Sequence, residues 1–278
     1  MNPIISLIRR YPQTSFWCIA CASFFVAAFQ GFSGAWAFLI YGSFLGGALV
    51  TGIADGRGGL KQYFDRITRW RVGALWYVIA LGLPLLLNGL AVAFNIALGA
   101  ELPGFIRLPS IEDVVIAFFW PGLLGIALAE EPGFRGFALA RLLGSHSALK
   151  AALIVGGLHT LWHLPLLIQM LQEGYFVGLL TKALIIVSAS IFFTWLFVNT
   201  RGSVLIAMLL HASEDLFAGD GSTLTLGLLQ SGFSAAELVR QDILEAAVFV
   251  AMAALIVLFT GGGLGAERPA GLPAQSLL

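Results

Sequence analysis

Charged residues and cysteines are both scarce in this chain. Only 11% of its 278 residues are Asp, Glu, Lys or Arg, and 15 basic residues balance 15 acidic ones. Nucleic-acid binding usually requires a basic excess, so this even balance argues against nucleic acid as a partner. The two cysteines, Cys18 and Cys21, lie within an apolar stretch and are not expected to form a disulfide framework or a structural zinc site.

Several familiar catalytic motifs are missing as well. The sequence has no Gly-rich phosphate loop and no Walker motif. Ser203 and Ser213 are not embedded in a Gly-x-Ser-x-Gly elbow, so a lipase-type serine nucleophile is not indicated. We find no internal repeat of the kind that marks many transporters.

Hydrophobic residues, in contrast, make up 59% of the chain, and its mean hydropathy is +0.91. A bilayer core of about 30 Å requires roughly 20 apolar residues per helix, so the apolar runs predict an all-α polytopic membrane protein with about eight transmembrane helices. The predicted spans are Phe16–Gln30, Gly34–Ile53, Val72–Leu98, a span from about Asp113, Ala151–Leu171, Phe176–Val198, Val204–Phe217 and Ile243–Phe259. We expect one integral-membrane domain over residues 1–262 and a disordered tail over residues 263–278, which are rich in Gly, Pro and Ala.

The basic residues are distributed unevenly between the predicted loops. Cytoplasmic loops of membrane proteins carry more Lys and Arg than the loops on the other side. This distribution therefore predicts that both termini lie in the cytoplasm. The side predicted to be cytoplasmic holds Arg9, Arg10, Arg57, Lys61, Arg66, Arg69, Arg71, Arg141, Lys150, Arg201 and Arg268, whereas Arg107 and Arg240 fall on the other side. Between residues 57 and 71, apolar residues at helical spacing alternate with basic ones, which predicts a helix on the membrane surface.

Ionisable residues interrupt three of the apolar stretches. A charged residue at the centre of a membrane helix costs roughly 2.5 to 3.5 kcal/mol on insertion scales, so such residues indicate a functional site. In the first stretch, Glu131 and Arg135 stand at i and i+4 and are expected to pair. Glu130 points about 100° away from them and is the candidate general base. Pro132 is expected to kink the helix at this point, and Gly133 to allow a close backbone approach.

The other two stretches contribute histidines. His159 and His163 stand one helical turn apart, which keeps a zinc pair open as an alternative, although Thr160 occupies the position where a common metalloprotease motif has Glu. His211 and Asp215 repeat the i, i+4 spacing and place an imidazole and a carboxyl on one helix face. An ion pair that only holds helices together is the structural alternative for each group.

The order of these motifs resembles the CPBP family of intramembrane proteases, which includes CAAX proteases, bacteriocin-processing enzymes and abortive-infection proteins. The resemblance rests on Glu130-Glu131-Pro132-Gly133-Phe134-Arg135, on Leu161-Trp162-His163-Leu164-Pro165, and on Arg201-Gly202-Ser203 ahead of His211 and Asp215. It covers roughly residues 55–217, with a protease core at about 113–217. One departure is visible, since His159 stands where the family's motif has Phe.

The resemblance implies an intramembrane glutamic endopeptidase without a cofactor. Glu130 and His163 would activate water, His211 and Asp215 would stabilise the oxyanion, and Glu131 and Arg135 would support the site. The cavity is expected to open to the cytoplasm, and the substrate to be a peptide or a lipidated peptide in a prokaryotic inner or plasma membrane. Alternatives are a zinc protease using His159 and His163, and a non-proteolytic scaffold or bacteriocin self-immunity protein. The oligomeric state is not predicted.

Overall fold

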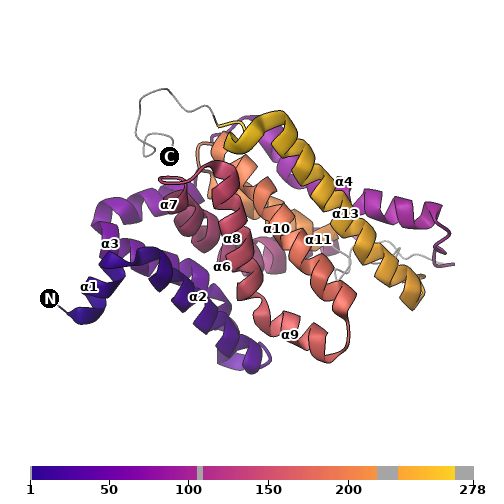
Figure 1. The fold of residues 1–278 in the computed structure, drawn as a ribbon, viewed down its shortest axis with the longest axis horizontal. Coiled ribbons are helices and arrows are strands. Elements are labelled where there is room, and N and C mark those ends of the chain that lie inside the picture. Colours follow the sequence, from indigo (N-terminus) through magenta and orange to yellow (C-terminus); the bar gives the residue numbers. More distant parts are fainter. Residues whose placement is uncertain (1, 105–108, 218–230, 267–278) are drawn as a thin grey trace.

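The computed structural model describes residues 2–104, 109–217 and 231–266, and all regular elements in these ranges are helical (Figure 1). The α-helices are α1 (Pro3–Arg10), α2 (Pro12–Phe29), α3 (Gly42–Ile67), α4 (Ala74–Ala97), α5 (Ile111–Ala117), α6 (Leu128–Glu131), α7 (Ala140–Leu142), α8 (Ala148–Trp162), α9 (Leu164–Gln172), α10 (Phe176–Asn199), α11 (Val204–Phe217) and α13 (Ala235–Thr260). Two 3₁₀ helices, η1 (Gly34–Tyr41) and η4 (Gly261–Gly263), and two π-helices, η2 (Phe118–Ala127) and η3 (Pro132–Leu139), accompany them.

The lengths of these helices confirm the predicted all-α polytopic class. Within the described ranges, six helical stretches are long and apolar enough to cross a membrane, and the pair α8 and α9, bent by 56°, would be a seventh. The predicted count of about eight also included α11. Its 14 residues rise only about 21 Å at 1.5 Å per residue, which is less than the thickness of a hydrocarbon core.

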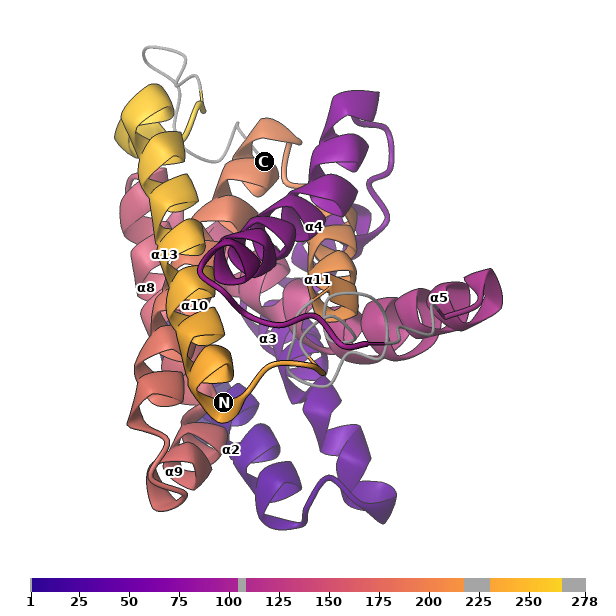
Figure 2. The ribbon, with the colours of Figure 1, turned by 90° about the vertical axis from the view of Figure 1, so that its right-hand side faces the viewer.

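The long helices pack side by side, with α10 between α8 and α13 (Figures 1 and 2). Small residues allow the closest approaches. A Cβ atom added to Gly133 in η3 would lie 2.5 Å from the backbone oxygen of Ser43 in α3, and one added to Gly156 in α8 would lie 3.0 Å from Cβ of Ser190 in α10. Ser43 and Ser190 donate hydrogen bonds to backbone carbonyls across these contacts, at 2.9 Å and 2.8 Å. Such contacts are a common way for helices to associate in membranes.

Arginine side chains from distant parts of the chain meet at one end of the helix bundle, which we call the basic end. Arg141, next to the α7–α8 connection, pairs with Asp55 of α3. Arg69 donates to the backbone oxygen of Arg201, and Arg201 donates to that of Arg71 at 2.6 Å. Arg9 of α1 donates to the backbone oxygen of Ile53 at 3.0 Å. The structure therefore brings together loops that the charge distribution placed on one side of the membrane.

The segment predicted as a membrane-surface helix is the second half of α3. Gly56 has φ +67°, and the helix bends there before continuing to Ile67. Tyr63 is buried against the first half of α3, and its hydroxyl donates to the backbone oxygen of Phe44 at 2.8 Å. Trp70 lies beyond the end of the helix and is 61% exposed. The predicted helix therefore forms, but it is shorter than the apolar pattern suggested.

The C-terminal end of the described chain packs against α10. Leu264 is fully buried, and its backbone oxygen accepts a hydrogen bond from Nδ2 of Asn199 at 2.8 Å. The packed region thus extends two residues past the predicted domain boundary at residue 262. Residues 267–278 of the predicted tail, with Arg268, lie outside the described residues, as does Arg107.

Candidate active site

The two adjacent glutamates lie in the middle of a long helical stretch that runs from Ile111 to Leu142. On either side of α6 the hydrogen bonding widens to the π pattern, in η2 and in η3. Pro132 keeps helical angles (φ −57°, ψ −40°), and the α-helical pattern of α6 changes to the π pattern of η3 at this residue. The wider turns of the π-helix accommodate the ring of Pro132, whose backbone nitrogen has no N–H to donate. Short π segments of this kind are frequent at functional sites. Every residue from Ala129 to Ala140 is buried.

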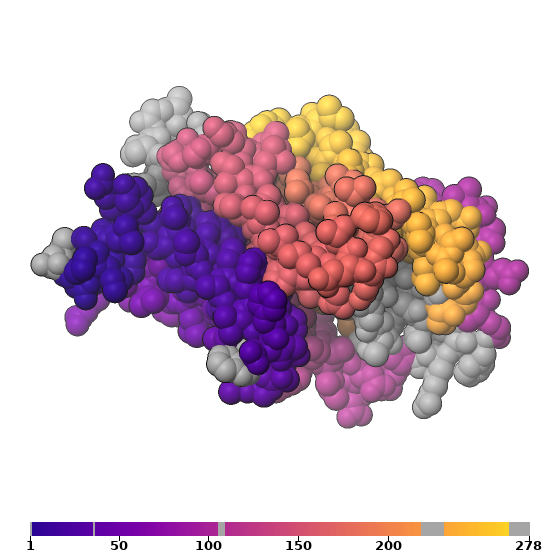
Figure 3. Space-filling model, turned by 60° about the horizontal axis from the view of Figure 1, so that its bottom comes forward, coloured from indigo at the N-terminus to yellow at the C-terminus, as the bar shows by residue number. Residues whose placement is uncertain are grey.

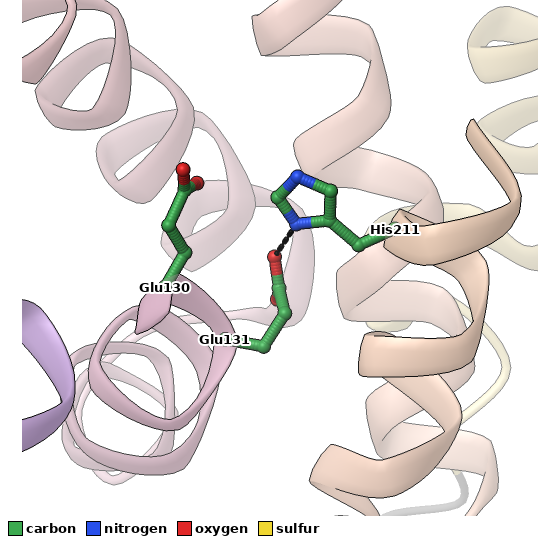
Figure 4. Close-up of side chains that lie close together, drawn as sticks. All are labelled: Glu130, Glu131 and His211. Carbon is green, nitrogen blue, oxygen red and sulfur yellow. Dashed lines mark hydrogen bonds and ion pairs between the residues drawn. The ribbon is translucent and has the colours of Figure 1, made fainter. Parts of the chain in front are cut away.

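Glu131 is at the centre of a buried polar network. Its Oε1 accepts a hydrogen bond from Nη1 of Arg135 at 2.8 Å, as the i, i+4 spacing predicted. The same oxygen lies 2.7 Å from Nδ1 of His211, a contact that the sequence did not predict (Figure 4). The guanidinium of Arg135 also lies over the ring of Phe193, 3.9 Å from its centroid. Glu131 and Arg135 are almost completely buried, so this network compensates both charges inside the bundle.

Glu130 has a different partner from the one expected. Its Oε2 lies 3.1 Å from Nε2 of His159, and among the described residues no hydrogen bond joins Glu130 to His163. The ring of Phe134 packs 4.4 Å from that of His159, centroid to centroid, and holds it from the other side. An ionised carboxylate only accepts hydrogen bonds, so with Glu130 in that form Nε2 of His159 is the donor of this contact.

His163 stands at the break between α8 and α9, where the helix axis bends. Its Nδ1 lies 3.1 Å from the backbone oxygen of His159. A carbonyl oxygen can only accept, so Nδ1 is the protonated nitrogen and Nε2 of the neutral ring keeps a free electron pair. The geometry thus leaves His163 with a nitrogen that can take up a proton.

His211 and Asp215 face each other along α11. Nε2 of His211 lies 3.8 Å from Oδ1 of Asp215, a distance that suits an ion pair but exceeds a hydrogen bond. Oδ2 of Asp215 is buried and has no hydrogen-bond partner within the described part of the chain. The predicted pair is therefore present, although the shorter contact of His211 is the one to Glu131.

A cavity of about 470 Å³ joins these groups. Glu130, His163, His211 and Asp215, the four predicted catalytic residues, all line it, as do His159 and Arg135. Two further charged residues, Lys182 of α10 and Glu214 of α11, line it as well. Sequence reasoning had assigned no role to Lys182, although a single lysine in an apolar span is itself a signal of a functional site.

A zinc site was the alternative interpretation of His159 and His163. The described residues that could hold a metal ion are Glu130, Glu131 and His211, whose ligand atoms all lie within 4.8 Å of one another (Figure 4). The predicted pair, His159 and His163, is not this group. In the structure, Oε1 of Glu131 already bonds Arg135 and His211, whereas Oε2 has no hydrogen-bond partner among the described residues.

Comparison with known proteins agrees with this geometry. Residues 112–217 match the family model of Rce1-like type II CAAX prenyl endopeptidases, and all the residues that line the cavity from η2, α6, α8, α10 and α11 lie within this segment. The resemblance to CPBP/CAAX proteases is confirmed. One curated protein of this family, the CAAX prenyl protease 2 of Methanococcus maripaludis, is 31% identical over 96 residues, which are 32% of the chain. The matched part spans about a third of that relative's length (35%).

Proposed function

We propose that this protein is an intramembrane endopeptidase of the CAAX-protease type, which hydrolyses a peptide bond without a covalent intermediate. The observation that carries the proposal is the convergence of Glu130, His163, His211 and Asp215 on one cavity, although they come from three separate parts of the chain: α6, the α8–α9 break and α11. The match of residues 112–217 to a family of CAAX prenyl endopeptidases supports the same class of reaction.

In the proposed reaction, the Glu130 carboxylate and Nε2 of His163 together bind a water molecule and remove one of its protons. The resulting hydroxide attacks the carbonyl carbon of the peptide, and the carbonyl oxygen becomes an oxyanion. The tetrahedral intermediate collapses as the C–N bond breaks, and the proton passes to the leaving amine. General base catalysis of this kind contributes about 10²–10⁴-fold in other enzymes.

The proposed oxyanion site is formed by His211 and Asp215. If Nδ1–H of His211 donates to Glu131, a donor at Nε2 requires the doubly protonated ring, and the nearby carboxylates of Glu131 and Asp215 favour that charge. Asp215 can itself donate only when protonated, or through water. Hydrogen-bond donors that are in position before the reaction stabilise the transition state by several kcal/mol in comparable sites.

We assign His159 a positioning role. Its hydrogen bond to Glu130 restrains one carboxylate oxygen, which leaves the other to face the water. The ring of Phe134 packs against the imidazole in turn. The family's motif has Phe at this position, so this hydrogen bond is a property of this chain and not of the motif.

The lining of the cavity suits an apolar peptide or a lipidated one. Side chains such as Phe24, Ile40, Ile126, Leu166 and Ile186 surround the polar centre. The relative from Methanococcus maripaludis carries the name of a prenyl protease. We propose that this chain likewise acts on a peptide or a lipidated peptide in a prokaryotic plasma membrane, with membrane lipid around it and both termini in the cytoplasm.

We further propose that the reaction requires no metal ion. Arg135 places a positive charge beside the only cluster of potential ligands found among the described residues, which disfavours a divalent cation there. Metal analysis of the purified protein, together with activity after chelation, tests this point. Stoichiometric zinc, with loss of activity on its removal, would support the metalloprotease alternative through Glu130, Glu131 and His211.

The test of the proposed function uses the full-length protein in proteoliposomes. Cleavage of a farnesylated CAAX peptide and of the same peptide without the lipid is measured for the wild type and for Glu130→Gln, with Glu112→Gln as the matched control because Glu112 is exposed at the start of α5. We expect Glu130→Gln alone to lose activity. If both variants match the wild type, or if the wild type cleaves no peptide while it still binds one, the scaffold or immunity alternative is favoured instead.

A further inference from the structure

Three arginines of the basic end lie close together beside η3. Arg66 of α3 donates from Nη1 to the backbone oxygen of Gly136 at 3.1 Å. The guanidinium of Arg141 lies over the ring of Phe137, 4.8 Å from its centroid. The positive charges of Arg69 and Arg141 both act on that of Arg66. We call Arg66, Arg69 and Arg141 the arginine cluster.

The carboxylates around the arginine cluster are fewer than the basic side chains. Residues 55–71 hold five Lys or Arg and only two Asp. Asp65 bonds Lys61 one helical turn away, and Asp55 pairs with Arg141. Both carboxylates are therefore already engaged, and the region keeps a net positive charge.

Arg66 and Arg69 carry the charge that is not compensated. Among the described residues neither forms a salt bridge, and their hydrogen bonds go to backbone oxygens instead. Nε of Arg66 is buried and has no hydrogen-bond partner in this part of the chain. Like charges that are held close together repel one another, and the repulsion grows as water is excluded. An anion bound at the arginine cluster would remove this repulsion and would supply the missing acceptor.

The geometry of the guanidinium group favours a phosphate as that anion. Its planar fork of N–H donors matches two oxygens of one phosphate group. Because Nη1 of Arg66 is bonded to Gly136, the edge formed by Nε and Nη2 is the one that suits such a pair of bonds. Arg69 and Arg141 add positive charge around this edge.

The position of the cluster favours a membrane lipid as the source of the phosphate. Arg66 lies at the end of α3 and Arg141 at the end of the helical stretch Ile111–Leu142, and both stretches are long and apolar enough to cross a membrane. Helix α1, against which α3 packs, forms one end of the long axis of the molecule (Figures 1 and 3). Trp70 is 61% exposed, and the guanidinium of Arg71 lies 5.2 Å from the centre of its ring system. Exposed tryptophans and basic residues next to membrane helices are typical of the headgroup region.

We propose that the arginine cluster binds the phosphate of an anionic phospholipid headgroup. This site goes beyond the proposed function, because none of the three arginines lines the cavity. It is nevertheless linked to the cavity through the backbone. Arg66 holds Gly136, which lies six residues after Glu130 on the same helical stretch, so a bound lipid would stabilise the end of the helix that carries the two glutamates.

Thermal unfolding of the full chain in detergent, followed by tryptophan fluorescence, tests the proposal. Dioleoylphosphatidylglycerol, dioleoylphosphatidylcholine and inorganic phosphate are each added at the same phosphate concentration. A ligand that binds only the folded protein raises its unfolding temperature. We expect the anionic phosphatidylglycerol to raise the unfolding temperature of the wild type by at least about 2 °C, and the other two additions to have a smaller effect.

Two cluster variants and one matched control locate the binding site. Arg66→Gln and Arg69→Gln should each lose most of the rise that phosphatidylglycerol causes. Lys150→Gln removes the same charge from an exposed position of the basic end outside the cluster, and it should keep the rise. Arg69→Gln leaves the bond from Arg66 to Gly136 in place, so it remains informative if Arg66→Gln does not fold.

Three results would overturn the proposal. An equal rise in Lys150→Gln and in both cluster variants would mean that lipid is attracted by the whole basic surface and not by this site. An equal effect of phosphatidylglycerol and phosphatidylcholine on the wild type would exclude selection of an anionic headgroup. An equal rise with inorganic phosphate would make the ligand a free anion. Glu130→Gln should keep the lipid-dependent rise, so a failure of the proposed function would be recognised separately.

Discussion

The surroundings of Glu131 and Glu130 contrast sharply, although the two residues are adjacent. Glu131 faces a buried network in which Arg135 and His211 bond the same carboxylate oxygen. Glu130 faces the cavity and bonds only His159 among the described residues. Both carboxylates are buried, yet one has its charge compensated and the other remains available for chemistry. Burial alone therefore does not distinguish the proposed catalytic carboxylate from its neighbour, whereas the number of fixed partners does.

The contrast predicts that removal of Glu131 has the largest effect on stability. Glu131→Ala leaves the guanidinium of Arg135 buried without its ion-pair partner, which typically costs about 3–5 kcal/mol in the free energy of unfolding. Thermal unfolding in detergent, followed by tryptophan fluorescence, measures this loss. The double variant Glu131→Leu/Arg135→Met removes both charges and should recover much of the stability. A single variant as stable as the wild type would mean that the network does not hold the fold.

On the cavity side, loss of His163 should reduce activity while the fold is preserved. His163→Ala removes the nitrogen proposed to share deprotonation of water, so kcat should fall by about 10²–10⁴-fold. His146→Ala is the matched control, because His146 lies in the α7–α8 connection at the basic end and outside the cavity. Equal activity of the two variants would remove His163 from the mechanism.

The packing of η3 against α3, next to the two glutamates, depends on Gly133. Gly133→Ala would place a methyl group 2.5 Å from the backbone oxygen of Ser43, which cannot move aside as a flexible side chain would. Overpacking of this kind commonly costs about 1–3 kcal/mol. Gly157→Ala is the control, since a Cβ there meets nothing within 4 Å. If both variants unfold at the same temperature, the contact between α3 and η3 is not tight.

His159 should have the smallest effect of these four residues. His159→Phe removes the hydrogen bond to Glu130 but keeps an aromatic ring beside Phe134. We expect kcat to fall by about tenfold, the equivalent of roughly 1.4 kcal/mol, with little change in KM. His159→Gln, whose amide can still donate to the carboxylate, should recover part of the loss. A merely structural role would instead lower stability and leave kcat intact.

The polar residues singled out from the sequence line one cavity, but sequence reasoning did not predict all of their partners. The i, i+4 rule predicted the pair of Glu131 and Arg135 because both residues lie on one helix. The bonds from Glu131 to His211 and from Glu130 to His159 join different helices, and their formation depends on packing between helices that spacing along the chain cannot reveal. The same limit applies to Pro132, where spacing along the chain gave no sign of the change to π turns.

The most direct test of the division between the two glutamates compares Glu130→Gln with Glu131→Gln in one preparation. Peptide cleavage and thermal unfolding are measured for each variant in parallel with the wild type. The account predicts that Glu130→Gln unfolds like the wild type but loses at least about 100-fold in kcat, while Glu131→Gln unfolds at a clearly lower temperature. Full proteolytic activity of Glu130→Gln would contradict the account.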